Sequence, residues 1–225
     1  MLTIQLIKDK TCKIDVIQFQ KVINHLTKTV KLEILDEKYD FPERLLNGPA
    51  TAKKYYKKFQ NQITGDEVLI LTDVPYDDNY FLHEHKELAI ISFYDWKNLT
   101  PLPKENGLLY WICVIAFAFV QTNYISHDET TGCLNDFLGD KNGIDRGMRQ
   151  AFLCEECLLK LKRKKLNAEQ KLILKDVTVL LDYLSSKSRW NTGILSKENT
   201  EPKKIIINNR ESNKSGEVKL FIASP

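Results

Sequence analysis

The chain has 225 residues, of which 43% are hydrophobic and 28% are charged, as is typical of a soluble globular protein. Its 33 basic and 30 acidic residues leave a formal net charge of +3, which excludes nucleic-acid binding driven by bulk charge. The most apolar run, Leu108 to Val120, is too short to span a bilayer, and no secretory signal is visible. We therefore expect a cytoplasmic protein with no membrane partner, and nucleic acid is not an expected partner either.

Strand and helix patterns alternate along the first half of the chain. Apolar residues at helical spacing predict a helix in VIQFQKVINHL (16–26), and Pro49 predicts the start of another that ends near Gly65. Short apolar runs predict strands at LTIQLI (2–7), VKLEIL (30–35), EVLILTDV (67–74) and ELAIISFYDW (87–96). Because strands and helices alternate, the fold class expected is α/β with a mixed sheet.

The second half is predicted to be mainly helical before it turns polar. An apolar helix is predicted at LLYWICVIAFAFVQ (108–121), and a longer one at AEQKLILKDVTVLLDYL (168–184), where the lysines form a solvated face. We divide the chain into a domain at 1–165, a C-terminal helix at 166–190, a polar linker at 191–216, and the first strand of a truncated downstream domain at 217–225.

Three of the five cysteines lie between residues 132 and 157. Cys154 and Cys157 form a CxxC pair that places two thiolates on one side of a tight turn, and Cys133 is far enough upstream to fold back. Zinc takes four ligands, usually thiolate and imidazole. His127 is the fourth candidate, or failing that Asp128, which gives a closed site with no open position for chemistry. The alternative is three buried free cysteines without metal. A redox pair is disfavoured by the two glutamates between the cysteines.

Residues 117–157 resemble the archaemetzincins, which are zinc-dependent, metallopeptidase-like proteins of the zincin fold. Their signature is HExxHxxGxxHC, four residues, CxM, about 17 residues and CxxC. The likeness aligns Cys133 with CxM, Cys154 and Cys157 with the closing pair, His127 with the third histidine, and Asp128 with the first cysteine. It implies a zincin-like mixed sheet with packed helices, a structural zinc loop and a C-terminal helical extension, with one zinc per chain.

The chain departs from that signature where the catalytic residues would stand. Phe117, Ala118 and Gln121 occupy the positions of the first histidine, the glutamate and the second histidine. A zincin needs two imidazoles one helical turn apart and a carboxylate that deprotonates a water molecule. The sequence therefore predicts an inactive, metallopeptidase-like binding or sensing module, whose cleft could accept a peptide or protein ligand.

An alternative prediction is a metal-dependent hydrolase with a non-standard site made by His127, His83 and His85. Alternate residues of a strand share one face, but the sequence favours a solvated loop for His83–His85.

The last residues carry a second resemblance. KLFIASP (219–225) resembles the first strand of TIR-like domains. That likeness implies a multidomain prokaryotic protein in defence or signalling, with a downstream effector domain as partner.

Overall fold

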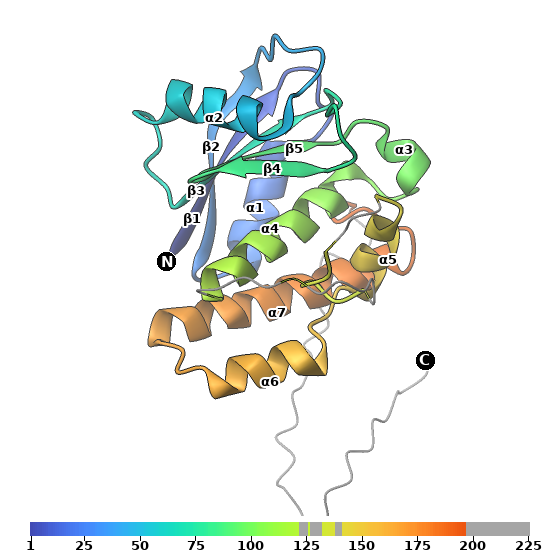
Figure 1. Ribbon diagram of the computed structural model, residues 1–225. Helices are drawn as coiled ribbons and strands as arrows, with labels where there is room; N and C mark the ends of the chain where they lie inside the picture. The colour runs from blue at the N-terminus through green and yellow to red at the C-terminus, as the bar shows by residue number, and fades with distance from the viewer. Residues whose placement is uncertain (122–125, 127–131, 138–140, 197–225) are drawn as a thin grey trace, which may run out of the picture.

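Figure 1 shows the computed structural model, in which residues 1–121, 126, 132–137 and 141–196 are described. Five strands form one sheet in the order β2-β1-β3-β5-β4. All neighbours are parallel except β4 and β5, so the sheet is mixed, as predicted. The strands are β1 (Leu2–Asp9), β2 (Val30–Tyr39), β3 (Glu67–Thr72), β4 (Leu82–His85) and β5 (Leu88–Ser92). The helices are α1 (Val16–Leu26), α2 (Gly48–Phe59), α3 (Trp96–Leu99), α4 (Lys104–Val120), α5 (Gly143–Gln150), α6 (Glu155–Arg163) and α7 (Ala168–Ser188).

The inner strands are apolar on both faces because each face is covered by helices. In β3, Leu69 and Leu71 face the core formed with α1, α4 and α7, whereas Val68 and Ile70 face a smaller core under α2. This follows from the two-residue side-chain period of a strand. Figure 1 shows α2 on one side of the sheet and the other long helices on the opposite side.

Helix α7 is held to the rest of the molecule by one buried carboxylate as well as by apolar packing. Asp176 Oδ2 accepts hydrogen bonds from the backbone N–H groups of Lys28, Thr29 and Val30 and from the hydroxyl of Thr29. These donors belong to the turn between α1 and β2 and to the first residue of β2. The start of α7 is fixed separately by a capping box between Asn167 and the third residue of α7.

Residues after α7 continue to pack on the domain. In the first part of the segment predicted as a linker, Ile194 is buried and its N–H donates to the side chain of Asn106 in α4. The tyrosine hydroxyl of Tyr183 donates to the carbonyl of Ile194. Residues 197–225, which include the predicted strand at 217–225, lie outside the described residues.

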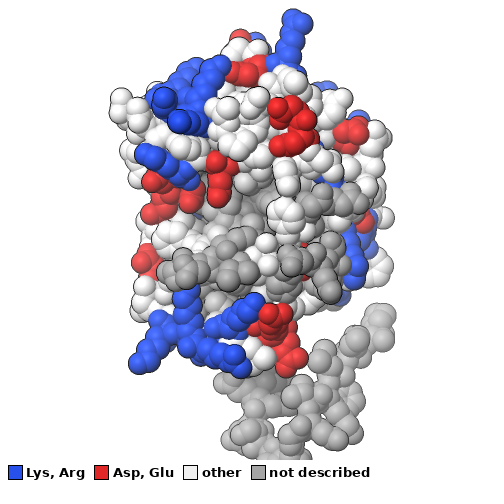
Figure 2. Space-filling model, in the orientation of Figure 1, with Lys and Arg blue, Asp and Glu red and all other residues white. Residues whose placement is uncertain are grey.

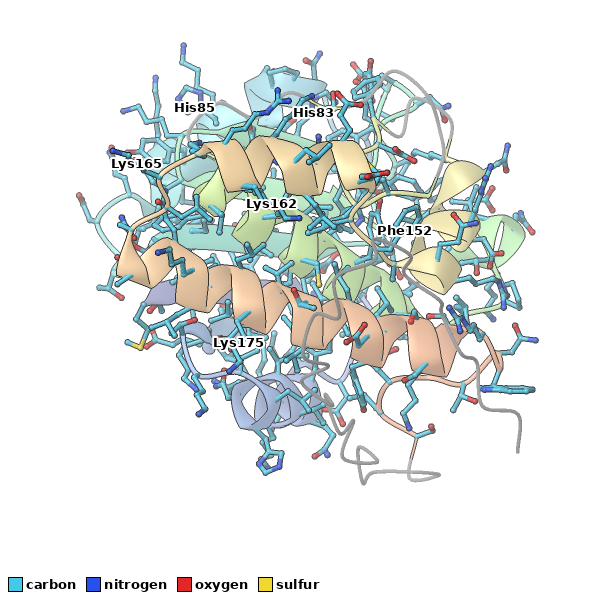
Figure 3. The ribbon with its side chains drawn as sticks, turned by 90° about the horizontal axis from the view of Figure 1, so that it is seen from below. His83, His85, Phe152, Lys162, Lys165 and Lys175 are labelled. Carbon is cyan, nitrogen blue, oxygen red and sulfur yellow. The ribbon has the colours of Figure 1, made fainter. Side chains whose placement is uncertain are left out.

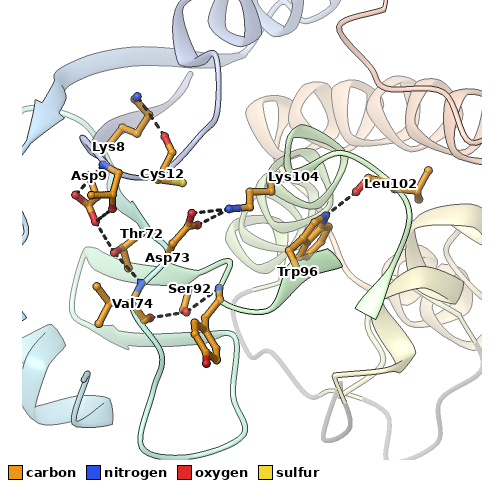
Figure 4. Close-up of polar contacts among 12 residues, drawn as sticks. Lys8, Asp9, Cys12, Thr72, Asp73, Val74, Ser92, Trp96, Leu102 and Lys104 are labelled. Carbon is orange, nitrogen blue, oxygen red and sulfur yellow. Dashed lines mark hydrogen bonds and ion pairs between the residues drawn. The ribbon is translucent and has the colours of Figure 1, made fainter. Parts of the chain in front are cut away.

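The carboxyl ends of β1 and β3, where ligands often bind in parallel sheets, hold a network of internal contacts (Figure 4). Asp9 Oδ2 accepts from the hydroxyl of Thr72 at 2.9 Å, and Lys104 pairs with Asp73 at 2.6 Å. Burial, together with the neighbouring Asp73 carboxylate, raises the pKa of the Cys12 thiol. Because these groups bind one another, we interpret this edge of the sheet as structural.

The hairpin of β4 and β5 differs from the prediction of a solvated loop at His83–His85. Leu82–His85 pairs in antiparallel register with β5, across a turn in which Lys86 has a φ of 54°. The usual turn signals, Asn-Gly or Asp-Gly, are absent from this Lys-Glu turn, which explains why the sequence did not indicate a hairpin.

Candidate metal centre

The three predicted cysteines converge in the structure. Cys133 lies in a loop that bridges to Phe152, while Cys154 is the N-cap residue of α6 and Cys157 lies in its first turn. Their ligand atoms all lie within 4.8 Å of one another, and the sulfurs of Cys133 and Cys157 are 3.9 Å apart. All three are free thiols, since the sulfur atoms of a disulfide would be about 2 Å apart.

Backbone N–H groups point at these sulfurs. The N–H of Asn135 and that of Cys154 lie 3.5 and 3.3 Å from Cys133 Sγ, and the N–H of Cys157 lies 3.5 Å from Cys154 Sγ. Such donors stabilise a thiolate more than a neutral thiol. Burial acts in the opposite direction and raises the pKa of the Cys133 and Cys157 thiols. A bound cation would favour the deprotonated form of these two cysteines.

The cluster suits a zinc ion. Zinc–thiolate bonds of about 2.3 Å in tetrahedral geometry place two sulfurs about 3.8 Å apart, which is close to the separation of Cys133 and Cys157. Two of the three sulfur-bearing residues are fully buried and one is half-buried. The predicted fourth ligands, His127 and Asp128, lie outside the described residues.

Asp136, which was not among the predicted site residues, shapes the cysteine loop. Its carboxylate accepts from the N–H of Gly132 at 2.5 Å and of Cys133 at 3.1 Å. These bonds fix the backbone that presents Cys133. No motif indicates this role, because an aspartate three residues after a cysteine is also an ordinary turn residue.

The two strand histidines do not join the cysteines. His83 Nε2 lies 2.7 Å from Asp78 Oδ2. The ring of His85 packs edge-on against the ring of Tyr56 in α2, with 5.4 Å between the two ring centroids. In the part of the chain that the structure describes, the cysteine cluster alone brings three or more potential ligand atoms together.

A largely apolar groove of about 430 Å³ lies between β4 and α4. β4 forms one end of the sheet order and pairs only with β5 among the described strands. Ser92 donates its N–H to the carbonyl of Phe81, so these two residues form a hydrogen-bonded pair between the strands. In an antiparallel ladder, hydrogen-bonded and non-hydrogen-bonded residue pairs alternate along each strand. The backbone groups of Leu82 and Glu84 therefore face outward. The groove is lined by Tyr80, Phe81, Leu82, His83, Glu84, Tyr110, Trp111, Val114, Ile115, Ala118, Asp136 and Phe137.

The three positions that the sequence resemblance aligns with zincin catalytic residues lie on or beside α4. The side chain of Phe117 is fully buried in the larger core, and Ala118 lines the groove. Gln121 directly follows the helix, and its N–H donates to the carbonyl of Phe117. None of these three side chains is an imidazole or a carboxylate.

Comparisons with known proteins include a match to a solved structure. No family model matches the sequence, and no curated protein matches it. A crystal structure of a zinc-dependent peptidase from Methanocorpusculum labreanum (strain Z) is similar to the chain with a TM-score of 0.44 and 16% identity. The match covers 70% of this chain and 99% of that one.

No helix among the described residues is long and apolar enough to cross a membrane.

Proposed function

We propose that the chain is a catalytically inactive, metallopeptidase-like module that binds an extended peptide in the groove between β4 and α4. The observation that carries this proposal is the outward edge of β4 beside an apolar groove. A peptide that adds to such an edge forms main-chain hydrogen bonds, while alternate side chains enter the neighbouring groove. The buried indole N–H of Trp111 in the groove wall has no partner among the described residues, and a bound peptide would supply one.

Catalytic inactivity is proposed from the residues that face the groove from α4. A bound peptide would meet Ala118 and other apolar side chains of this helix. No carboxylate or imidazole stands at the positions of Phe117, Ala118 and Gln121. The helix could therefore contribute to binding without contributing to bond cleavage.

A structural zinc would stabilise the loop that borders this groove. Cys133, Cys154 and Cys157 would hold the metal, with His127 or Asp128 as fourth ligand, and a closed site of this kind supplies a cross-link and no chemistry. Asp136 and Phe137, which line the groove, directly follow the loop that carries Cys133. Reduced cysteines are required, which fits the cytoplasmic location that we infer.

Strand addition can be tested with a proline at an outward-facing position. We expect peptides selected from a random library to bind the parent and the Glu84→Ala variant, but not the Glu84→Pro variant. Proline removes an N–H that the β4–β5 ladder does not use, so the hairpin should remain folded. Circular dichroism checks the fold, and fluorescence anisotropy measures the affinity. Equal affinity of the proline variant, or no selectable peptide, would contradict the proposal.

The competing proposal is a metal-dependent hydrolase that uses His127, His83 and His85. The His83–Asp78 pair beside the groove is the observation in its favour. That proposal requires a second, chelator-sensitive metal and cleavage of peptides that is lost in His83→Ala. One zinc per chain and no cleavage would favour the binding module.

The module's setting is inferred from the resemblance of residues 219–225 to a TIR-like strand. On that basis, peptide binding would be a sensing step that controls a downstream effector domain in prokaryotic defence or signalling.

A further inference from the structure

A second surface of the molecule is strongly basic. Between residues 160 and 175 the sequence has seven lysines and arginines and one glutamate. The whole chain has a net charge of only +3, so the remainder is net acidic. Figure 2 shows Lys and Arg side chains gathered over α6 and the turn that follows it, with acidic side chains at the other end of α6.

Four of the lysines line a hollow of about 350 Å³, which we call the basic hollow. They come from the end of α6, the α6–α7 turn and the first turn of α7, and the apolar part of the hollow is formed by Leu161 and Leu166. In Figure 3, α6 and α7 run side by side, Lys162 lies between them and Lys165 lies at the turn. The four lysines are Lys162, Lys164, Lys165 and Lys171.

These cations are not neutralised within the described part of the chain. The nearby Lys160 pairs with Glu156 at 2.7 Å, and the only acidic residue of the segment, Glu169, contacts the amino group of Met1. No described carboxylate lies within 4.0 Å of a lysine of the basic hollow. Like charges around one concavity repel one another, and a bound anion would relieve that repulsion. A solvated face would not require the four lysines to surround a hollow.

Two backbone hydrogen bonds shape the α6–α7 turn beside the hollow. The N–H of Lys164 donates to the carbonyl of Leu161 at 3.1 Å, and the N–H of Leu166 donates to the carbonyl of Lys164 at 3.0 Å. The capping box of Asn167 then starts α7, whose N-terminal dipole adds positive potential. A binding surface whose backbone is already fixed loses less entropy when a ligand binds.

We propose that the basic hollow binds a compact, multiply charged phosphate group, such as the di- or triphosphate part of a small ligand. Its concave shape favours a compact anion over an extended nucleic-acid backbone or a flat membrane surface. This site is distinct from the proposed peptide groove, because the two share no lining residue. Lysine ammonium groups that act together are common phosphate binders.

The proposal is tested with inorganic tripolyphosphate and the full chain. We expect tripolyphosphate to raise the melting temperature more than sodium chloride at equal ionic strength, and calorimetry to show one site. Lys164→Gln combined with Lys165→Gln should weaken binding about tenfold, because two of the charges are lost. The matched control combines Lys53→Gln and Lys57→Gln, two exposed lysines one turn apart on α2, and should bind like the parent.

Several results would overturn the proposal. One is a tripolyphosphate effect no larger than that of sodium chloride, and another is equal weakening in the α2 control. Binding only to vesicles that contain anionic phospholipid, or only to duplex DNA, would assign the surface to a macromolecule instead. Zinc content and peptide binding are measured on the same variants and should be unchanged, so failure here is distinguishable from failure of the proposed peptide function.

Discussion

Glu67 at the start of β3 is a carboxylate held in an unfavourable position. Burial and its neighbours Glu84, Glu87 and Asp66 raise its pKa from 4.5 to about 7. The folded state therefore binds a proton more tightly than the unfolded state does. The stability that protonated Glu67 contributes is fully present below about pH 4.5, and it is lost as the pH rises through about 7.

We predict that Glu67→Gln stabilises the protein at pH 8 by about 1–2 kcal/mol, a value reduced for solvent screening, and changes little at pH 4. Urea unfolding at the two pH values measures the difference. Glu37→Gln, on β2 outside this acidic group, is the control and should show no such contrast. A Glu67→Gln variant that gains nothing at pH 8 would contradict the argument.

Some residues of the candidate site can be predicted from the sequence, and others cannot. The CxxC spacing led to Cys154 and Cys157, and the loop length allowed Cys133 to join them, because metal ligands must meet whatever the surrounding fold. The role of Asp136 could not be predicted, since its hydrogen bonds depend on the loop conformation. Nor could the Asp73–Lys104 pair, which joins residues that are distant in sequence.

At the scale of elements, α7 depends on the carboxylate of Asp176. One oxygen of that residue accepts four hydrogen bonds from the turn between α1 and β2 and from the first residue of β2. We predict that Asp176→Asn lowers the free energy of unfolding by about 3 kcal/mol, because a neutral amide oxygen accepts these bonds more weakly than a carboxylate oxygen does. Urea denaturation at pH 7 measures this loss.

Asp182→Asn is the matched control for this prediction. Asp182 lies on the exposed side of the same helix, so its replacement should change stability by about 0.5 kcal/mol or less. Equal effects of the two substitutions would mean that the bonds to the turn contribute little.

The two longest helices and four of the five strands were predicted from apolar patterns, whereas the short strand β4 was not. The apolar run of α4 and the stripe of α7 indicate buried helices from sequence alone, and both helices are present. β4 has only four residues and depends on β5 for its register. Short strands of this kind carry little sequence signal, because their stability comes from the partner strand. The same pairing creates the edge on which the proposed peptide function rests.

The cysteine cluster connects regions of the whole molecule that apolar packing joins only weakly. α6 buries only Cys157 and Leu161, whereas α7 buries a full stripe of side chains. The loop that carries Cys133 leads to the groove, and α6 leads to the basic hollow. A metal bound by Cys133, Cys154 and Cys157 would therefore order both surfaces.

Zinc removal should accordingly affect the stability of the whole domain. We predict one zinc per chain by elemental analysis, and a loss of several kcal/mol in Cys154→Ser, as is usual for structural sites. For a domain of this size that corresponds to a decrease of about 10 °C in melting temperature, and a strong chelator should have the same effect on the parent. Cys113→Ala is the control, since Cys113 is buried in α4 outside the cluster; it should keep its zinc. Unchanged melting after chelation, or loss of zinc from the Cys113 variant, would show that these cysteines do not form a structural metal site.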